Sequence, residues 1–412
     1  MKMNAYVAGV GMTRFGKFLD RGLKSLAAQA INEALVDAGL TGADLQAAYM
    51  GNAAAGVMTG QVLIPGEVVL RGMGIGGIPV INVENACATS ATAFQQAVQM
   101  ITLGAYDVVL VAGFEKLHHE DKRRTFSVFQ GAVDTEAMPA LMAYLADNMK
   151  ATGAQGDVSG AGASRSLFMD LYASMSRNYM AKTGATARHF AMVSAKNSVH
   201  GSLNPKAQYT TRVTVDEVLA SPMIADPLTL LMCSPIGDGA AALVLVSERK
   251  AREMGLRDRV KVLSSELMSG WDYPAGQPGV PEVAVQRAYQ AAGLGPQDLD
   301  VVELHDASAP AELMYYEYLG LADPGEGVAL IESGATALGG RIPVNPSGGL
   351  LRKGHPIGAS GAGQIVELVD QLRGRCGARQ VQGARTALAE NGGGFIGTDV
   401  AAIVISILQR ED

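Results

Sequence analysis

Cysteine, long apolar runs and excess positive charge are all scarce or missing in this sequence. Its 412 residues include 3 cysteines, Cys87, Cys233 and Cys376, which are too far apart for a disulfide framework or a zinc-binding pair. So few thiols are typical of a reducing compartment, and we expect a cytoplasmic location. The net charge of −7 excludes the broad basic surface of a nucleic-acid-binding protein, so no nucleic-acid partner is expected.

Signals for membranes and bound cofactors are also missing. No apolar run reaches the roughly 18 residues that a bilayer-spanning helix needs, so no membrane association is expected. The start, MKMNAYVAGVGM, is predicted to be a first strand and not a signal peptide, and SILQRED at the end carries no peroxisomal or prenylation signal. GVGMTRFG does not complete a dinucleotide-binding pattern. We therefore expect no bound cofactor and no metal.

The sequence is rich in apolar residues, which make up 48% of the chain. Residues 26–39 have apolar positions at helical spacing. Nearly continuous apolar runs, typical of strands buried on both faces, occur at residues 5–10, 107–112, 239–246, 260–263, 301–304 and 400–408. This alternation of strands and helices predicts a layered α/β fold with mainly parallel strand pairing.

Three pairs of segments match each other in the same order along the chain. Residues 33–51 match 287–304, residues 89–104 match 359–374, and residues 237–241 match 397–402. Ordered matches indicate a duplicated α/β unit. Residues 118–236 interrupt the pattern, and we predict an inserted loop domain there. The N-terminal half is then 1–117 with 237–255, and the C-terminal half is 256–412.

Cys87 is the first candidate for chemistry, within VENACATSATAFQQAVQMITLG. A strand is predicted to end near Val83 and a helix to begin after Cys87, so the thiol lies at the N-terminal side of a helix. The helix dipole and free backbone N–H groups would lower the pKa of the thiol and favour a nucleophile. The alternative is a small buried thiol with a packing role.

His355 is the second candidate, within the glycine-rich segment GGRIPVNPSGGLLRKGHPIGASGAG. It precedes the helix that repeats the one after Cys87, and equivalent ends of a duplicated unit can face one site. A histidine there would take a proton from a thiol or donate to an oxyanion. The alternative is a structural turn with a capping histidine.

A third group combines His305, at the predicted end of a strand, with Glu390, which stands just before three glycines in a predicted turn between strands. Sites form at strand ends of α/β folds, and glycine-rich turns present N–H groups to anions. Glu390 would be a general base if it were partly removed from water. The alternatives are a helix-capping histidine and a solvated carboxylate.

Taken together, these residues make the chain similar to the thiolase superfamily, in particular to thiolases of the sterol-carrier-protein or lipid-transfer-protein type. The similarity covers nearly the whole length and is carried by ENACATSATA, GFEK, KNSVHGSLNPKAQY, DEVLASPMIADPLTLLMCSPIGDGAAALVL, ELHDASAPAELMYYEYLGL and NPSGGLLRKGHPIGASGAGQ. The resemblance implies two duplicated βαβαβαββ halves in a layered α/β/α/β/α core with an inserted loop domain. It also implies homodimers or tetramers built around the N-terminal halves.

The resemblance also implies substrates and roles. An acyl-CoA thioester would be the substrate, with coenzyme A as co-substrate. Cys87 would be the acylated nucleophile, His355 the group that activates it, and His305 part of a hole for the substrate carbonyl. The backbone N–H groups of Cys87 and Gly392 would form a second, oxyanion-binding hole.

The chain departs from the family pattern at the second cysteine. Other thiolases place a cysteine where Glu390 stands, and sterol-carrier-type members often carry one where Ala307 stands. The proton transfers would then fall to Glu390, whose pKa burial would raise, or to His305. The sequence leaves this choice open.

We therefore expect an acyl-CoA C-acyltransferase that cleaves a 3-oxoacyl-CoA with CoA, or runs the reverse Claisen condensation, through a Cys87 acyl-enzyme. One alternative is a retro-aldol lyase on a 3-hydroxyacyl-CoA, which Tyr315, Tyr316 and Tyr318 keep open. Another is an acyl-CoA-binding subunit that is active only with a small OB-fold, zinc-ribbon partner. Residues 138–166 and 271–274 are candidates for shaping a pocket for a bulky or aromatic acyl group, although the methionines among them would serve equally as core filler.

Overall fold

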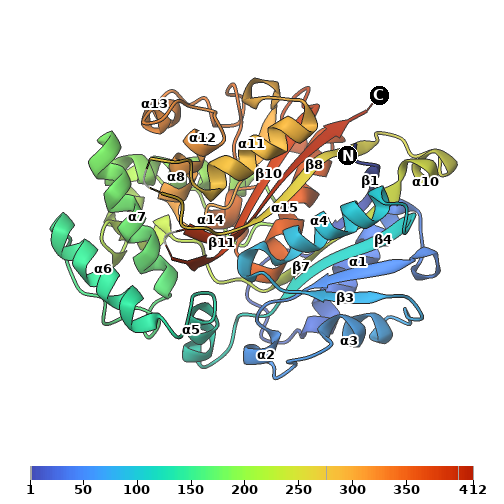
Figure 1. Ribbon diagram of the computed structural model, residues 1–412, viewed down its shortest axis with the longest axis horizontal. Coiled ribbons are helices and arrows are strands. Elements are labelled where there is room, and N and C mark those ends of the chain that lie inside the picture. Colours follow the sequence, from blue (N-terminus) through green and yellow to red (C-terminus); the bar gives the residue numbers. More distant parts are fainter. Residues whose placement is uncertain (1, 275, 398, 412) are drawn as a thin grey trace.

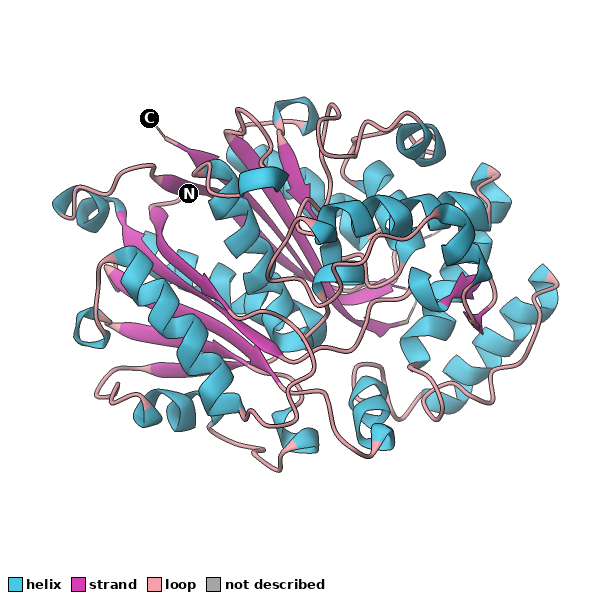
Figure 2. Ribbon diagram, turned by 180° about the vertical axis from the view of Figure 1, so that it is seen from behind, coloured by secondary structure: helices cyan, strands magenta, loops and turns pink. Residues whose placement is uncertain are grey.

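Nine strands form one sheet in the order β3-β2-β4-β7-β1-β8-β11-β10-β9 in the computed structural model, which describes residues 2–274, 276–397 and 399–411 (Figure 1). The N-terminal half supplies β1 (Ala5–Met12), β2 (Ala47–Gly51), β3 (Val80–Val83), β4 (Val108–Glu115) and β7 (Gly239–Ser247). The C-terminal half supplies β8 (Val260–Ser269), β9 (Val301–Glu303), β10 (Thr386–Ile396) and β11 (Asp399–Arg410). The halves join through the pairs Tyr6–Lys261 and Val7–Val260, so the junction is narrow. Accordingly, Figure 2 shows the strands as two groups with helices on both sides.

Helices separate the strands of each half. The N-terminal half has α1 (Leu23–Ala38), α2 (Ala55–Met58), α3 (Pro65–Gly72), α4 (Thr89–Thr102) and, after β7, α10 (Glu248–Glu253). The C-terminal half has α11 (Val280–Ala292), α12 (Ala309–Tyr318), α13 (Gly327–Glu332), α14 (Gly349–Lys353) and α15 (Ile357–Leu372). No helix in the described ranges is long and apolar enough to cross a bilayer.

The matched sequence segments occupy equivalent places, which confirms the duplicated fold. In each half a helix with a glycine C-cap in the left-handed conformation, Gly39 or Gly293, leads to the second strand. Helices α4 and α15 precede β4 and β10, and β7 and β11 each lie between the first and fourth strands of their half. In the C-terminal half the counterpart of β3 is reduced to an isolated bridge between Val302 and Val344.

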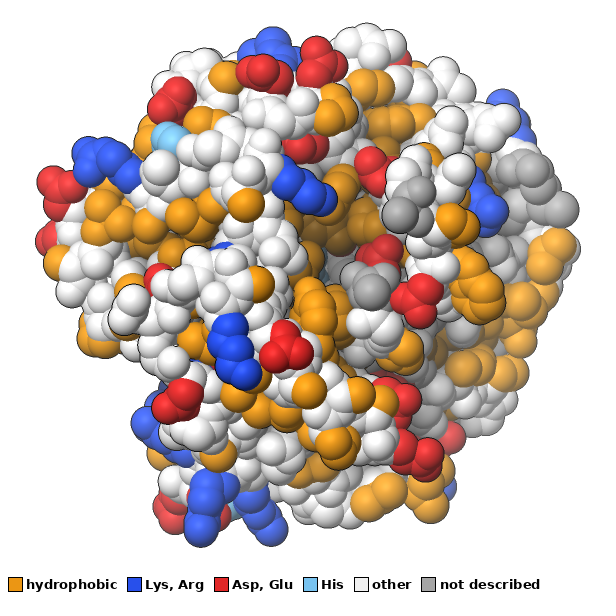
Figure 3. Space-filling model, turned by 60° about the vertical axis from the view of Figure 1, so that its left-hand side comes forward, with side chains coloured by type: hydrophobic (Ala, Val, Ile, Leu, Met, Phe, Trp, Pro, Cys, Tyr) orange, Lys and Arg blue, Asp and Glu red, His pale blue; other side chains and the backbone are white. Residues whose placement is uncertain are grey.

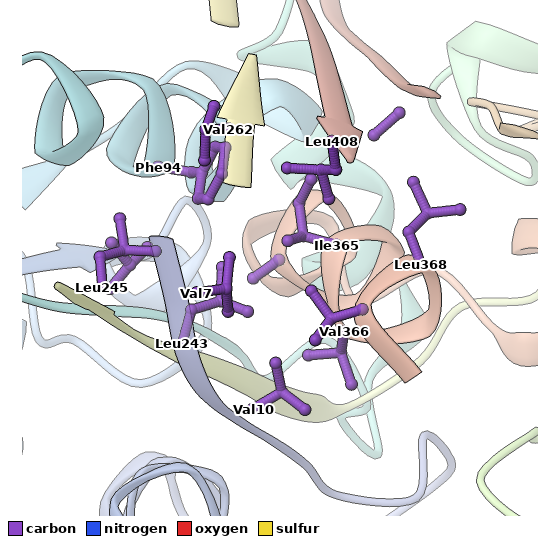
Figure 4. Packing of buried hydrophobic residues seen from close by; sticks show 14 of the residues in the cluster. Val7, Val10, Phe94, Leu243, Leu245, Val262, Ile365, Val366, Leu368 and Leu408 are labelled. Carbon is purple, nitrogen blue, oxygen red and sulfur yellow. The ribbon is translucent and has the colours of Figure 1, made fainter. Parts of the chain in front are cut away.

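Three buried clusters fill the spaces between five layers. The first lies between the two parts of the sheet and includes Val7, Phe94 and Ile365, around α4 and α15 (Figure 4). The second packs α11, α12 and neighbouring helices against the C-terminal strands, and the third packs α1 and α3 against the N-terminal strands. The layers are therefore α/β/α/β/α, as expected from the resemblance.

The expectation of mainly parallel pairing is wrong. Strands β2–β3, β2–β4 and β9–β10 are parallel, but β7 runs antiparallel to β1 and β4, and β11 to β8 and β10. Strands β4 and β7 are buried along their whole length whichever way they run. Because a continuous apolar run reports burial on both faces, it does not report strand direction.

The segment between β4 and β7 is mainly helical and shares a buried cluster with the C-terminal half. It contains α5 (Lys122–Gln130), α6 (Met138–Thr152), α7 (Leu167–Thr183), α8 (Ala187–Ser202) and α9 (Val215–Ala220), with the short pair β5 (Met223–Ala225) and β6 (Leu228–Thr229). Helix α8 packs on α12 and α14 of the C-terminal half. The face with these helices is hollowed, with hydrophobic side chains inside the hollow (Figure 3).

A close approach of backbones holds α4, α15 and β4 together. A Cβ atom built at Gly113 on β4 would lie 2.4 Å from the carbonyl oxygen of Gly358 and 2.6 Å from Cβ of Ser90. Ser90 Oγ also accepts a 2.9 Å hydrogen bond from the backbone N–H of Ala362. Glycine at position 113 therefore permits both helix starts to meet at the end of β4.

We predict that Gly113→Ala lowers the free energy of unfolding by about 1–3 kcal/mol, because the added methyl group meets backbone and not a flexible side chain. Gly76→Ala is the matched control, since a Cβ there would have nothing within 4 Å, and it should change the free energy by less than about 0.5 kcal/mol. Chemical denaturation of the two variants measures both values. Equal stability of the two variants would contradict the close packing at Gly113.

Candidate active site

Cys87 lies in a single 3₁₀ turn, Ala86–Ala88, between β3 and α4. Ala86 has φ 48°, a left-handed conformation that is unusual for a residue with a side chain. Thr89 Oγ1 fixes the turn, because it accepts from the N–H of Asn85 at 2.9 Å and donates to the carbonyl of Ala86 at 2.6 Å. Gly393 of β10 packs on the turn, where a Cβ would lie 2.9 Å from the nitrogen of Cys87.

His355 approaches this thiol from the other half of the chain. Its Nε2 lies 3.3 Å from Cys87 Sγ, and its Nδ1 lies 2.8 Å from Ser360 Oγ. Ser360 donates its own hydroxyl proton to the carbonyl of Pro356 at 3.0 Å, so it accepts from Nδ1–H. Nε2 is then unprotonated and accepts the hydrogen of the thiol.

Burial keeps both members of this pair uncharged. It raises the pKa of Cys87 to about 12, with further increases from the Glu115 and Glu84 carboxylates. The backbone N–H groups of Cys87 and Gly394 act in the other direction but are outweighed. The pKa of His355 lies well below its usual value because of burial and the neighbouring His305. The expectation of a lowered thiol pKa is therefore wrong, because desolvation and the two carboxylates outweigh the backbone N–H groups at the start of α4.

His305 follows β9 and stands edge-on to His355, with ring centroids 5.0 Å apart and an interplanar angle of 88°. Its Nδ1 lies 2.9 Å from the side-chain amide nitrogen of Asn391. That nitrogen donates, so Nδ1 accepts and the ring proton is on Nε2. Burial lowers the pKa of His305 to about 4, so the ring is neutral near pH 7. The N-cap of α12 is Ser308, so the alternative of a helix-capping histidine is wrong.

Glu390 lies inside β10 and not in a turn, because Glu390–Gly393 all pair with β11. Its side chain is 0% exposed, so the alternative of a solvated carboxylate is wrong. Oε2 accepts from the backbone N–H of His305 at 2.8 Å, and Oε1 has no hydrogen-bond partner among the described residues. Burial raises the pKa of Glu390 to about 7, while His305 N–H and the nearby Tyr315 hydroxyl lower it in part.

Glu115, at the end of β4, is a buried carboxylate for which the sequence predicted no role. It accepts backbone N–H bonds from Ala53 and Ala54 at 3.1 Å and from Gly358, at the start of α15, at 3.0 Å. Burial raises its pKa to about 7. Glu115 thus joins the segment after β2 to the helix that follows His355. The sequence feature that could have indicated this role is the GFEK segment, in which the acidic residue Glu115 directly follows an apolar run.

A buried ion pair holds the segment before His355. Lys353 Nζ lies 3.0 Å from Glu303 Oε2, and the two side chains are 2% and 0% exposed. Ser347 Oγ donates to the same carboxylate at 2.7 Å. Because Glu303 ends β9 just before His305, this pair ties the segments of the two histidines together.

A cavity of about 440 Å³ opens over these groups and is lined by Cys87, His305, His355 and the glycines Gly392, Gly393 and Gly394. Of residues 138–166, the last three line the cavity, whereas Met138 and Met142 pack in a buried cluster between α6 and α7. Trp271 is 70% exposed and does not line it. Cys233 lies in the wall, and the buried Cys376 lies elsewhere.

The same three side chains offer the ligand atoms with which this site would hold a metal. One atom from each of Cys87, His305 and His355 lies within 4.8 Å of the others. A thiolate with two imidazoles suits a soft cation such as Zn²⁺. A metal bound there would occupy the Cys87 sulfur and one ring nitrogen of each histidine, so these atoms would not be available for acyl or proton transfer.

Known proteins similar to this chain match it over nearly its whole length. Acetyl-CoA acetyltransferase of Methanothermobacter thermautotrophicus is 37% identical over 397 residues, covering 95% of this chain and 97% of the relative. The benzoylsuccinyl-CoA thiolase subunit BbsB of Thauera aromatica is 36% identical over 390 residues, covering 93% and 92%. Sterol carrier protein 2 of Bos taurus is 35% identical over 405 residues, covering 95% and 70%.

Solved structures share the fold. An Ltp2–ChsH2(DUF35) aldolase superposes with a TM-score of 0.77 at 26% identity, covering 98% of this chain and 97% of that chain. Human mitochondrial 3-ketoacyl-CoA thiolase superposes with a TM-score of 0.68 at 17% identity, covering 100% and 99%.

Family models agree with these similarities. The thiolase N-terminal domain matches residues 5–249, and the thiolase C-terminal domain-like family matches residues 279–406. With the duplicated five-layer fold, these matches establish that the chain belongs to the thiolase superfamily and is an acyltransferase enzyme, with sterol-carrier-type proteins among its relatives.

Proposed function

We propose that this enzyme cleaves a 3-oxoacyl-CoA with coenzyme A, or runs the reverse Claisen condensation, through an acyl group carried on Cys87. The observation that carries the proposal is the 3.3 Å contact between Cys87 Sγ and an unprotonated His355 Nε2. A neutral base beside a neutral thiol can accept the proton as the sulfur attacks, so no thiolate need exist beforehand. The similarity to acetyl-CoA acetyltransferase and to a benzoylsuccinyl-CoA thiolase subunit supports the same reaction class.

In the cleavage direction Cys87 Sγ attacks the 3-oxo carbon, and its proton moves to His355 Nε2. The C2–C3 bond breaks, the acyl group stays on sulfur, and the electron pair moves to C2 and the thioester oxygen. His305 Nε2–H is the donor proposed for the thioester oxygen, and the N–H groups of Cys87 and Gly392 for the oxygen at C3. The thiol of CoA then attacks the acyl-enzyme, the Cys87 sulfur leaves and takes its proton back from His355, and the proton of the CoA thiol restores the acid that protonated C2.

Glu390 is the better candidate for protonating C2. Its pKa of about 7 leaves a large fraction of the carboxylic acid at neutral pH, whereas a histidine with a pKa of about 4 carries almost no acidic proton there. The buried Oε1, which has no hydrogen-bond partner among the described residues, provides the atom that would hold this proton. The carboxylate form would remove a proton from the α-carbon in the condensation.

We predict that incubation with a 3-oxoacyl-CoA in the absence of CoA adds one acyl mass to the peptide containing Cys87. Cys87→Ser should lose both this adduct and turnover, because no thiol remains to be acylated. Cys233→Ser is the matched control, since Cys233 lines the same cavity, and it should keep the adduct. Peptide mass spectrometry of all three proteins measures the acyl adduct, and release of acyl-CoA products with CoA present measures turnover. Acylation of Cys233, or turnover without any adduct, would overturn the proposed intermediate.

We predict that Glu390→Gln lowers the rate of C–C bond cleavage by about 10²–10⁴-fold, the range for loss of a general acid. Exchange of labelled CoA into a simple acyl-CoA needs acyl transfer to Cys87 but no proton at C2, so it should stay within a few-fold of the parent rate. Both rates are measured on the same preparations. Equal losses in the two assays would assign Glu390 a structural role and not a proton-transfer role.

We predict that single-turnover acylation by a 3-oxoacyl-CoA slows as the pH rises through about 7. The reason is that the acid form of Glu390 donates the proton, and this form is lost above its pKa. The condensation direction should show the opposite slope, because it uses the carboxylate. Rapid-quench rates between pH 6 and 8.5 test this, and Glu390→Gln should remove the inflection. An inflection that persists in that variant would belong to another group.

A retro-aldol cleavage of a 3-hydroxyacyl-CoA is the second candidate function. It is favoured by the likeness to an Ltp2–ChsH2(DUF35) aldolase and by Tyr315, whose hydroxyl lies near Glu390. That assembly and the BbsB subunit also support a second subunit, for which we propose an OB-fold, zinc-ribbon protein. Cleavage of a 3-hydroxyacyl-CoA by the Cys87→Ser variant, alone or with such a subunit, would favour the lyase.

A further inference from the structure

The elements that line the cavity over Cys87 fall into two groups. One group is α5, residues 164–166 and residues 234–236, and it contributes Phe126 and Phe129 as well as the polar side chains Ser164, Ser166 and Ser234. The other side is built by α7, α11, α12 and the β10–β11 pair. Cys87 is part of the same lining, and the acyl and CoA parts of a thioester extend in different directions from the carbonyl carbon next to its sulfur.

Charge distinguishes the two sides as well. Helix α5 begins with the exposed cations Lys122, Arg123 and Arg124, of which Arg123 is paired with Asp121 at 3.0 Å, whereas Glu282 and Asp399 belong to the cavity lining itself. The nucleotide part of CoA carries several phosphate charges, which the basic start of α5 attracts and the two carboxylates repel. The amide-containing arm of CoA therefore fits the α5 side, and the acyl group fits the opposite side.

We call the opposite side the acyl chamber and define it by Tyr172, Met175, Met314, Tyr315 and Tyr318. The rings of Tyr315 and Tyr318 meet edge to face, with centroids 5.5 Å apart and an interplanar angle of 87°. Burial raises the pKa of Tyr172 and of Tyr315, and the nearby Glu390 raises both further, so the phenols stay neutral. Such rings can stack on a planar acyl group, and the flexible side chains of Met175 and Met314 can adapt to the edge of that group.

The outer end of the acyl chamber is acidic. Glu282 Oε2 accepts from the N–H of Gly279 at 2.6 Å, and Asp399 Oδ2 accepts from the N–H of Val280 at 3.0 Å. The pKa of Tyr318 is raised to about 12, mainly by burial and further by these two carboxylates. Their negative potential therefore reaches the chamber.

The described residues of the cavity wall offer no free positive charge against this acidic end. Among the cavity-lining residues that the structure describes, Arg165 is the one Lys or Arg side chain. It is paired to Asp170 at 2.6 and 2.9 Å. A carboxylate at the end of an acyl chain would therefore meet like charge without a free cation.

We propose that the acyl chamber selects an uncharged, ring-bearing acyl group and rejects acyl chains that end in a carboxylate. The inference rests on the proposed function in placing the thioester carbonyl at Cys87. It goes beyond that function because it assigns the substrate class to named residues. Glu282, Asp399 and Tyr318 are the specificity determinants.

Binding of acyl-CoAs to the Cys87→Ser variant, which has no thiol to acylate, tests this without requiring turnover. Isothermal titration of this variant with benzoyl-CoA, hexanoyl-CoA and glutaryl-CoA should give the tightest binding for benzoyl-CoA. Glutaryl-CoA should bind at least about tenfold more weakly. Glutaryl-CoA binding as tightly as benzoyl-CoA would overturn the inference.

Glu282→Lys should reduce the discrimination against glutaryl-CoA by about tenfold, because it replaces a repelling charge at the chamber mouth with an attracting one. Asp323→Lys makes the same charge change at an exposed residue outside the cavity and should leave the ratio unchanged. Equal effects of the two variants would mean that the overall charge of the protein, and not the chamber, sets the preference.

Tyr318→Leu should weaken benzoyl-CoA binding by about three- to tenfold, the value of one lost aromatic contact, and change hexanoyl-CoA binding little. Tyr144→Leu, at an exposed tyrosine outside the cavity, is the control. These binding preferences are independent of catalysis. If they hold while no 3-oxoacyl-CoA acylates Cys87, the proposed function fails and the inference stands. If Cys87 is acylated but the preferences are reversed, the inference fails and the proposed function stands.

Discussion

The close approach of α15 to α4 is the constraint on which the active site depends. Cys87 and His355 are 268 residues apart in the chain, yet their side chains meet because two equivalent helix starts are packed against each other. This contact needs glycine where backbones touch: a Cβ at Gly361 would lie 2.7 Å from the nitrogen of Ala91. Glu115 then fixes the start of α15 by accepting the N–H of Gly358. The geometry of the thiol–imidazole pair is therefore a property of the core and not of a flexible loop.

The same burial sets the chemistry of the site. It keeps the thiol and both imidazoles uncharged in the resting enzyme, and it raises the pKa of Glu390 to about 7. Charge then develops only during the reaction, next to donors that are already aligned. A preformed thiolate would need a buried cation beside it, and the partners found at Cys87 are neutral groups and carboxylates. Proton transfer coupled to attack is the arrangement that suits these surroundings.

Much of the fold and the site could be predicted from the sequence, because the responsible signals are local. Apolar runs located the strands, ordered matches located the duplication, a predicted strand-to-helix turn located Cys87, and a glycine-rich segment located His355. Strand direction could not be predicted, because residues buried on both faces look alike in parallel and antiparallel pairs. The three glycines after Asn391 were mistaken for a turn, although they permit close approach within β10. The raised pKa of Cys87 and the role of Glu115 depend on contacts between distant segments, which no local pattern contains.

The two histidines show how one duplicated scaffold obtains two different functions from one residue type. Ser360 donates its own proton to the carbonyl of Pro356 and accepts from His355 Nδ1–H, so His355 Nε2 can accept the thiol proton. The side-chain amide of Asn391 donates to His305 Nδ1, so the ring proton of His305 is on Nε2. The rings are 5.0 Å apart, so a second positive charge there would be strongly disfavoured. Only one imidazole can therefore become charged at a time, and the thiol is next to His355. This favours the proposed part of His305 as a neutral donor, and it supports the proposal that the remaining proton transfer belongs to Glu390, whose carboxylate accepts the backbone N–H of His305.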